Sequence, residues 1–136
     1  MKLDNQSMQY ITLFESITRS SVKDCFLNDG RIIFIVSPGN AFRAIGPNGR
    51  NIKKMENLTK KRVKVAEFSS DPVKFLMSFL YPIIPQKIQI DQNNNITIQA
   101  KTTQDRGILI GRDKKNLIYL KQVLAKYFKI ENINII

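Results

Sequence analysis

The sequence predicts a mixed α/β (α+β) protein that contains two copies of one six-element unit. Short apolar runs with alternating polar residues, typical of strands, are interspersed with segments of helical spacing. The order helix-strand-strand-helix-helix-strand occurs twice in 136 residues. A shift of 65 residues superposes matching positions of the two halves: Ile45-Gly46 on Ile110-Gly111, Ile52 on Leu117 and Leu58 on Val123. We therefore expect an internal duplication, with domains at 1–69 and 70–136.

The first unit opens with a predicted helix over residues 8–17. Five apolar residues recur there at helical spacing: Met8, Ile11, Leu13, Phe14 and Ile17. Asn5 or Ser7 is expected to cap its start. Two short runs rich in β-branched and aromatic residues follow at 21–27 and 31–37. Because Asp29-Gly30 between them favours a tight turn, they predict a β-hairpin.

The second strand is expected to lead into two helices and a third strand. Residues 40–46 form a short helix that Asn40 can cap, and residues 50–60 form a longer one. The longer helix should turn one apolar stripe inward: Ile52, Met55 and Leu58. Residues 62–68 alternate valine with basic residues, which indicates a half-exposed strand.

The same order follows in the second half. Ser70 or Asp71 should cap a helix that has Pro72 at its first position. Residues 87–100 alternate isoleucine with polar residues around an Asn-rich turn, which predicts a hairpin. The remaining expected elements are a short helix at 103–111, a longer helix at 114–128 and a final strand at 130–136.

Positive charge is the strongest global feature of the chain. The formal net charge is +11 with a pI of about 10.0, which favours polyanionic partners. The segment 43–64 carries net +7 and the segment 101–129 net +6, whereas the remainder sums to −2. A solvated lysine face would spread its charge over all exposed elements. The clustering instead indicates phosphate contacts around two helix-turn-helix segments.

Composition also excludes several kinds of chemistry. The chain has no His, so imidazole acid-base catalysis and His-containing metal sites are excluded, and we expect no cofactor. Its single Cys25 cannot form an internal disulfide and is expected to be a small packing residue. The first ten residues lack the apolar run of a secretory signal, and no window is apolar enough to span a membrane. We expect a cytoplasmic protein without a membrane partner.

The turn at 46–49, Gly-Pro-Asn-Gly, lies inside the first basic segment. Glycines can take up left-handed conformations and let another chain approach closely. The free amides that start the following helix favour anions, and Arg50, Lys53 and Lys54 add full charges. Two glycines at this spacing are a weak signal alone. Their place between a short helix and a basic amphipathic helix makes the signal stronger.

This pattern resembles the KH domain, which clamps a single-stranded nucleic-acid backbone with a GXXG loop. The helix-first order resembles the type II variant, which has a three-stranded sheet with helices on one face. Nearly the whole chain resembles the archaeal NusA-like transcription factors, which are tandem KH proteins. The match is carried by residues 10–25, by 31–36 with 38–72, and by 105–128.

The resemblance implies a set of RNA-binding residues in both units. In the first unit they are Gly46, Pro47, Asn48, Gly49, Arg50, Lys53 and Lys54, with Ala44, Ile45, Ile52 and Val36 as a hydrophobic groove for bases. In the second unit they are Gly111, Arg112, Lys114 and Lys115. Core packing is an equally good interpretation of Ile45 and Ile52. For Tyr119, Tyr127 and Phe128, core packing is favoured over base stacking.

The two loops depart from the family pattern in different ways. Pro47 removes one amide donor from the first loop. In the second loop Lys114 stands where the closing glycine should be, and Asp113 places a negative charge on the expected phosphate path. We therefore expect the first unit to contribute most of the affinity for RNA.

The resemblance implies a non-catalytic factor that binds nascent single-stranded RNA in transcription termination or antitermination. A ribosome-associated or ribosome-assembly protein is the alternative, because type II KH units also occur there. Duplex DNA binding is a further alternative, and an enzyme is disfavoured because no carboxylate pair lies near the basic loops. A contact with RNA polymerase is left open. We expect a monomer.

Overall fold

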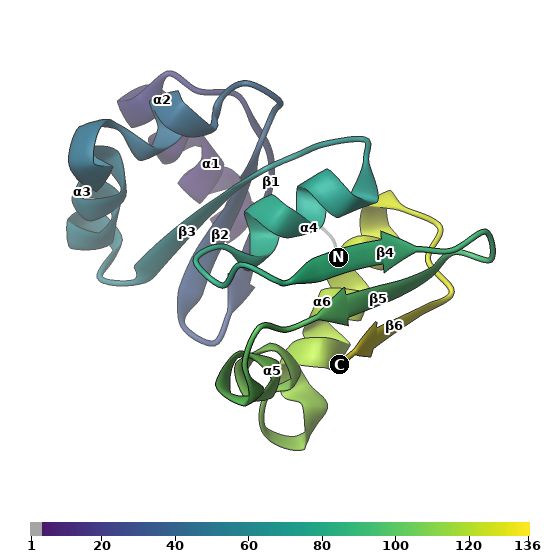
Figure 1. Cartoon of the computed structure of the whole chain (residues 1–136). Coiled ribbons are helices and arrows are strands. Elements are labelled where there is room, and N and C mark those ends of the chain that lie inside the picture. Colours follow the sequence, from purple (N-terminus) through teal and green to yellow (C-terminus); the bar gives the residue numbers. More distant parts are fainter. Residues whose placement is uncertain (1–3) are drawn as a thin grey trace. The chain divides into compact units, whose positions relative to one another are not determined.

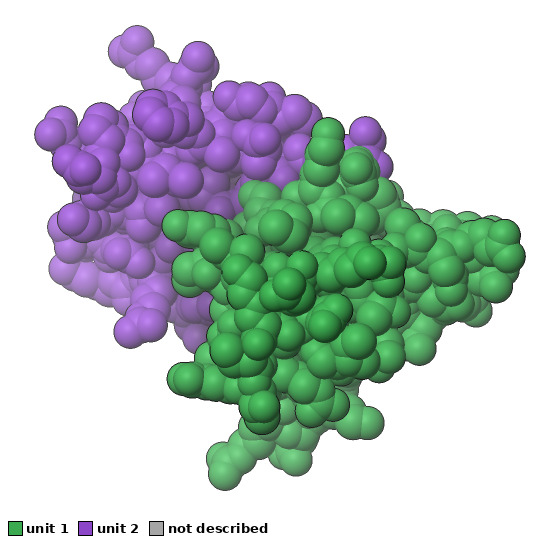
Figure 2. Space-filling model, in the orientation of Figure 1, with its two compact units in different colours: residues 1, 71–136 green, residues 2–70 purple. Residues whose placement is uncertain are grey.

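The structure, a computed structural model, describes residues 4–136. The chain divides into two compact units between Ser70 and Asp71 (Figure 2). In chain order we call them the first unit, which ends at Ser70 and is purple in Figure 2, and the second unit, which begins at Asp71 and is green. Each unit has the predicted order helix-strand-strand-helix-helix-strand (Figure 1). Each contains its own three-stranded sheet. The predicted α+β fold class with two six-element units is therefore confirmed.

The first unit has the sheet order β1-β2-β3. Its elements are α1 (Asn5–Thr18), β1 (Val22–Asn28), β2 (Arg31–Val36), α2 (Ala41–Ile45), α3 (Arg50–Thr59) and β3 (Arg62–Glu67). β1 and β2 are antiparallel, and the turn between them has positive φ at both Asp29 and Gly30. Two successive positive φ angles match the twist of a hairpin, which explains the Asp-Gly pair there.

The second unit repeats this arrangement with the sheet order β4-β5-β6. Its elements are α4 (Pro72–Leu80), β4 (Lys87–Ile90), β5 (Asn95–Gln99), α5 (Thr103–Ile110), α6 (Lys115–Tyr127) and β6 (Asn132–Ile135). As predicted, Asp71 caps α4 by accepting from the amide of Val73 at 2.9 Å, with Pro72 at the first helical position.

In each unit the middle strand pairs in parallel with the last one. A parallel pair cannot be closed by a hairpin and needs a crossover, which here consists of two helices joined by a short loop. In the first unit this crossover is α2, the loop 46–49 and α3. The predicted glycine turn therefore lies within the crossover between β2 and β3.

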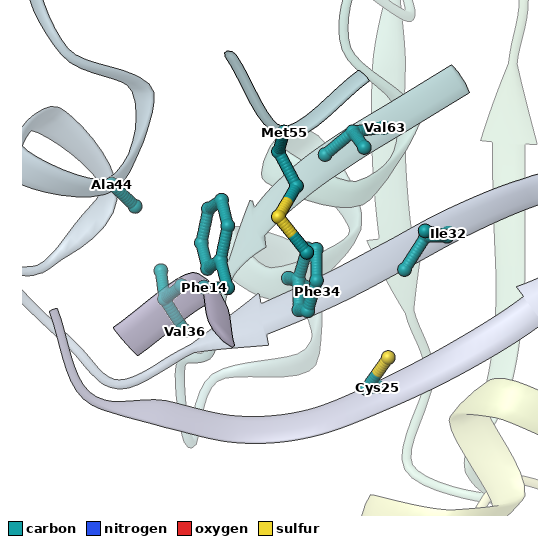
Figure 3. Packing of buried hydrophobic residues seen from close by; sticks show 8 residues of the cluster. All are labelled: Phe14, Cys25, Ile32, Phe34, Val36, Ala44, Met55 and Val63. Atoms are coloured by element: carbon teal, nitrogen blue, oxygen red, sulfur yellow. The ribbon is translucent and has the colours of Figure 1, made fainter. Parts of the chain in front are cut away.

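One face of the first sheet is covered by α1, α2 and α3. Phe14 of α1 stacks on Phe34 of β2 with ring centroids 4.1 Å apart (Figure 3). Ala44 of α2 and Met55 of α3 are also fully buried in this cluster. Each crossover helix thus contributes a buried side chain, which fixes the two helices that flank the loop.

The core of the second unit is built around Phe75 of α4. Its ring contacts those of Phe79, Tyr127 and Phe128 at centroid distances of 5.7, 5.6 and 5.8 Å. Tyr119 packs its ring against Phe79 at 6.5 Å. These contacts agree with the core interpretation of the three aromatic residues of α6 and its C-terminal end.

Helix caps and one apolar stripe differ from expectation. Asp4, not Asn5 or Ser7, caps α1, because its carboxylate accepts from the amide of Ser7 at 2.7 Å. Asn40 precedes α2 as predicted, but its side chain accepts from the amide of Ser21 and makes no capping bond.

Leu58, the last residue of the apolar stripe predicted for α3, is 56% exposed. A spacing of three residues drifts around a helix of 3.6 residues per turn, so this residue leaves the inward face.

A β-bulge interrupts the alternation of side chains along β1. Simple alternation puts Val22 and Cys25 on opposite faces, yet both pack on the first core. The register of β1 against β2 shifts between Val22 and Asp24, and this extra residue brings the two side chains to one face. Cys25 is 2% exposed, which confirms that it is a packing residue.

No helix in residues 4–136 is long and apolar enough to cross a membrane. Within the same residues, no group of three or more Cys, Asp or Glu side chains is arranged to hold a metal ion.

Phe34→Ala should remove one ring of the buried stack and lower the free energy of unfolding by about 3–5 kcal/mol. Leu58→Ala is the control, because the side chain of Leu58 is mostly exposed, and it should change stability by no more than about 0.5 kcal/mol. Urea denaturation followed by circular dichroism measures both. Equal effects of the two variants would contradict the assigned core.

Cys25 should resist alkylation in the native protein. Burial, followed by the charge of Asp24, raises the pKa of its thiol to about 12, so almost no thiolate exists near pH 8. Iodoacetamide labelling followed by mass spectrometry should be slow in buffer and fast in guanidinium. Rapid labelling of the native protein would contradict the assigned burial.

Candidate nucleic-acid interface

The loop between α2 and α3 depends on two glycines in left-handed or related conformations. Gly46 ends α2 with φ 76° and ψ 169°, and Gly49 precedes α3 with φ 71°. Asn48 between them also has a positive φ of 55°. Positive φ strains most residues but not glycine, so both glycines suit the path of the chain here. They let the chain reverse direction between two short helices.

Asn51, in the first turn of α3, holds this loop closed. Its side-chain amide donates to the carbonyl oxygen of Arg43 in α2 at 3.0 Å. A Cβ added to Gly46 would lie 2.8 Å from that amide nitrogen, so the side chain of Asn51 would have to shift from its present position. A glycine at position 46 therefore suits the asparagine brace as well as its own backbone angles.

The second loop has almost the same shape. Gly111 has φ 76° and ψ 169°, and the side chain of Asn116 donates to the carbonyl oxygen of Ile108 at 2.7 Å. Asp113 and Lys114 have φ angles of 53° and 61°, close to those of their counterparts in the first loop. The loss of the closing glycine has therefore left the backbone path unchanged.

Sequence reasoning missed the asparagine brace, although a signal for it was present. Asn51 and Asn116 are separated by the same 65 residues that relate the two loops. Each follows the first glycine of its loop by five positions. A polar residue kept at an equivalent position of an internal repeat was the sign of a structural hydrogen bond.

The first loop opens onto a shallow groove of about 390 Å³. Its lining comes from the loop and from one face of α3: Pro47, Asn48, Arg50, Lys53, Lys54 and Asn57. The α3 residues are spaced at three and four positions, so they lie on the same side of the helix. The structure thus brings five predicted residues together, and adds Asn57, which the sequence did not reveal.

The groove is suited to an anion. All of its α3 residues are exposed, three of them are cationic, and the first turn of α3 contains no acid. The residue before α3 is Gly49, which has no side chain to cap the first amides of the helix. A Cβ on Gly49 would meet nothing within 4 Å, so space beside the loop is open to an approaching chain.

The apolar residues predicted for a base-binding groove have different surroundings. Ala44 and Val36 are fully buried in the first core, so they cannot touch a ligand. Ile45 and Ile52 are half-buried, and Ile52 packs against the same core. In the second unit the predicted basic residues are all exposed: Arg112, Lys114 and Lys115.

Lys64 differs from the other basic residues of its segment. It lies on β3 and is half-buried. Burial, and then the nearby charge of Arg31, lowers the pKa of its ammonium group to about 8. Lys64 does not line the groove, so it adds to the net charge of the chain but not to the charge of the groove.

Comparison with known proteins agrees with this architecture. The sequence model of the KH domain matches residues 9–70. A "Probable transcription termination protein NusA" of Methanocaldococcus jannaschii is 31% identical over all of this chain and 75% of that protein. One of the same name from Halococcus morrhuae is 29% identical over 98% of this chain and 96% of that protein.

A solved structure is similar over the whole chain as well. The crystal structure of APE1850 is 31% identical and superposes with a TM-score of 0.74, covering 98% of this chain and 100% of that one. Both units are therefore part of the similarity, although the KH domain model matches the first alone. With the six-element order and the glycine loop, these similarities show that the chain belongs to the family of archaeal NusA-like KH proteins.

Proposed function

We propose that this protein is a transcription factor of the NusA type that binds nascent single-stranded RNA and acts in termination or antitermination. The observation that carries the proposal is the braced glycine loop beside the cationic groove of α3. The names of its relatives support a role in transcription termination. The KH domain itself is a module that clamps single-stranded nucleic acid.

The phosphate chain passes over Gly49 and along α3 in this proposal. Open space at Gly49 lets a backbone approach, while Arg50, Lys53 and Lys54 neutralise successive phosphates. The amides at the start of α3 add partial positive charge. RNA contacts in the first unit then comprise the seven residues Gly46, Pro47, Asn48, Gly49, Arg50, Lys53 and Lys54, with Ile45 and Ile52 beside them.

The second loop contributes less in this proposal. It has the shape of the first loop, but Asp113 and Lys114 put two charged side chains on the surface where the first loop has the neutral Asn48 and the bare backbone of Gly49. The carboxylate opposes a phosphate, and the long side chain occupies space that Gly49 leaves open. Arg112, Lys114 and Lys115 then attract RNA at longer range, around the backbone of Gly111.

We further infer that the protein acts in the cytoplasm as a binding factor without catalytic activity. The two domains are proposed at 1–69 and 70–136. A contact with RNA polymerase would use a surface other than the groove of α3, because that groove is assigned to RNA.

Gly49→Asp should reduce affinity for single-stranded RNA at least about tenfold, because it adds a negative charge and a side chain on the phosphate path. Lys114→Asp should cause a smaller loss. Gly30→Asp is the matched control, since Gly30 also has a positive φ of 75° and open space around it, but lies in the β1-β2 turn. Fluorescence anisotropy with labelled RNA measures all three.

Three outcomes would count against this assignment or against the proposed function. A larger loss from Lys114→Asp would reverse the ranking of the loops. Equal losses from Gly30→Asp and Gly49→Asp would show that net charge alone, and not the loop, determines affinity. A preference of the wild-type protein for duplex over unpaired RNA would contradict the proposed function.

The affinity of the wild-type protein should fall steeply with salt, since each neutralised phosphate of a single strand contributes about 0.7 to the slope of log K against log salt. Lys53→Ala should reduce that slope by about 0.7. Lys87→Ala, an exposed lysine of β4 outside both basic segments, should leave the slope unchanged. An unchanged slope for Lys53→Ala would remove that lysine from the interface.

A further inference from the structure

Phe42 of α2 is the most exposed large hydrophobic side chain among residues 4–136, with 89% of its surface accessible. Phenylalanine usually lies inside, because burying its side chain stabilises a fold by about 1.5–3 kcal/mol. The inward residue of α2 is Ala44, with Ala41 and Ile45 half-buried beside it. The ring of Phe42 therefore makes no evident contribution to the core.

Phe42 lies on the short helix that leads into the glycine loop. The amide of Gly46 donates to the carbonyl oxygen of Phe42 at 3.0 Å, so the two residues are one helical turn apart. One turn is about 5.4 Å, and residues four apart lie on the same side of a helix. A base attached to a phosphate at this loop can reach a ring at that distance.

Charges of both signs lie near α2, with the basic ones in the majority: the amide of Ala41 donates to the carboxylate of Glu67 at 3.2 Å. Arg43 is exposed beside it and donates to the carbonyl oxygen of Arg19 at 3.2 Å. No acidic residue occurs between Ala41 and Met55, a segment that contains four basic residues. A ligand that covers Phe42 must therefore tolerate positive charge and present a flat or apolar face. An unpaired nucleobase on its phosphate backbone meets both requirements.

The second unit has no counterpart of this ring. The same shift of 65 residues places Gly107 at the position of Phe42, on α5 before the second loop. A Cβ on Gly107 would meet nothing within 4 Å, so the glycine is not required by packing. The exposed ring is thus a property of the unit whose loop keeps both glycines.

We propose that Phe42 is a stacking platform for one unpaired nucleobase of the RNA held at the first loop. This inference rests on the proposed function and adds a base contact to a site otherwise built for phosphates. Stacking on an aromatic ring tolerates every base, since each has a π face. The contact thus distinguishes single strands, whose bases are free, from duplexes, whose bases are already stacked.

Phe42→Trp tests the contact directly, because the chain contains no tryptophan. Emission of the single introduced tryptophan should be quenched when unstructured oligouridine is added. Leu27→Trp is the control: Leu27 is 39% exposed on β1, next to the hairpin turn at the other end of β2 from α2. Its emission should not change. Quenching of both or of neither tryptophan would overturn the proposal.

Phe42→Ala separates base contact from phosphate contact. Affinity for oligouridine should fall about fivefold to 150-fold, the equivalent of about 1–3 kcal/mol for one stacked base. Affinity for an abasic ribose-phosphate oligomer of equal length should stay as in the wild type. Phe42→Tyr should retain binding to both. Lys53→Ala should weaken both, because it removes a phosphate contact.

The outcomes distinguish this inference from the proposed function. If wild-type protein binds oligouridine and Phe42→Ala binds it equally well, the stacking role is wrong and the RNA-binding function stands. That result would leave Phe42 as a contact for a protein partner. If wild-type protein binds neither oligomer, the proposed function fails, and the stacking role fails with it.

Discussion

The parallel pairing of β2 with β3 is the constraint on which the candidate interface depends. Strands that run in the same direction cannot be joined by a tight turn, so the chain must cross one face of the sheet. It does so as two helices, and their buried residues Ala44 and Met55 join the stacked rings of Phe14 and Phe34. The loop between the helices is thus anchored on both sides, while its own residues stay at the surface.

Loop shape and loop chemistry depend on different residues. The asparagine brace and the first glycine are present in both units, and the backbone angles of the two loops agree closely. The three residues after that glycine differ completely between the loops. Because the brace holds the shape, these positions can change from an open surface at Gly49 to a charged one at Lys114. An approaching chain therefore meets different side chains on the same backbone path.

The interface gathers features that lower the stability of a folded chain. Asn48 in the first loop, like Asp113 and Lys114 in the second, adopts a left-handed conformation, which costs about 1 kcal/mol or more in a residue with a side chain. Phe42 exposes a ring, and α3 carries several like charges on one side. Such features persist where the rest of the fold holds them in place. At the first loop, the left-handed Asn48, the exposed ring of Phe42 and the like charges of α3 occur together, which is physical support for a binding role there.

The sequence by itself determined the type and order of the helices and strands, the duplication, and the position of the cationic loops. Periodicity, turn residues and charge act over a few neighbouring positions, so they can be recognised along the chain. Only the tertiary structure decided that Asp4 caps α1, that a bulge turns Val22 toward the core, and that Asn51 braces the loop. It also decided that Ala44 is covered while Phe42 is not. Which side of a short helix is covered depends on contacts with residues far away in the sequence, and such contacts leave little local pattern.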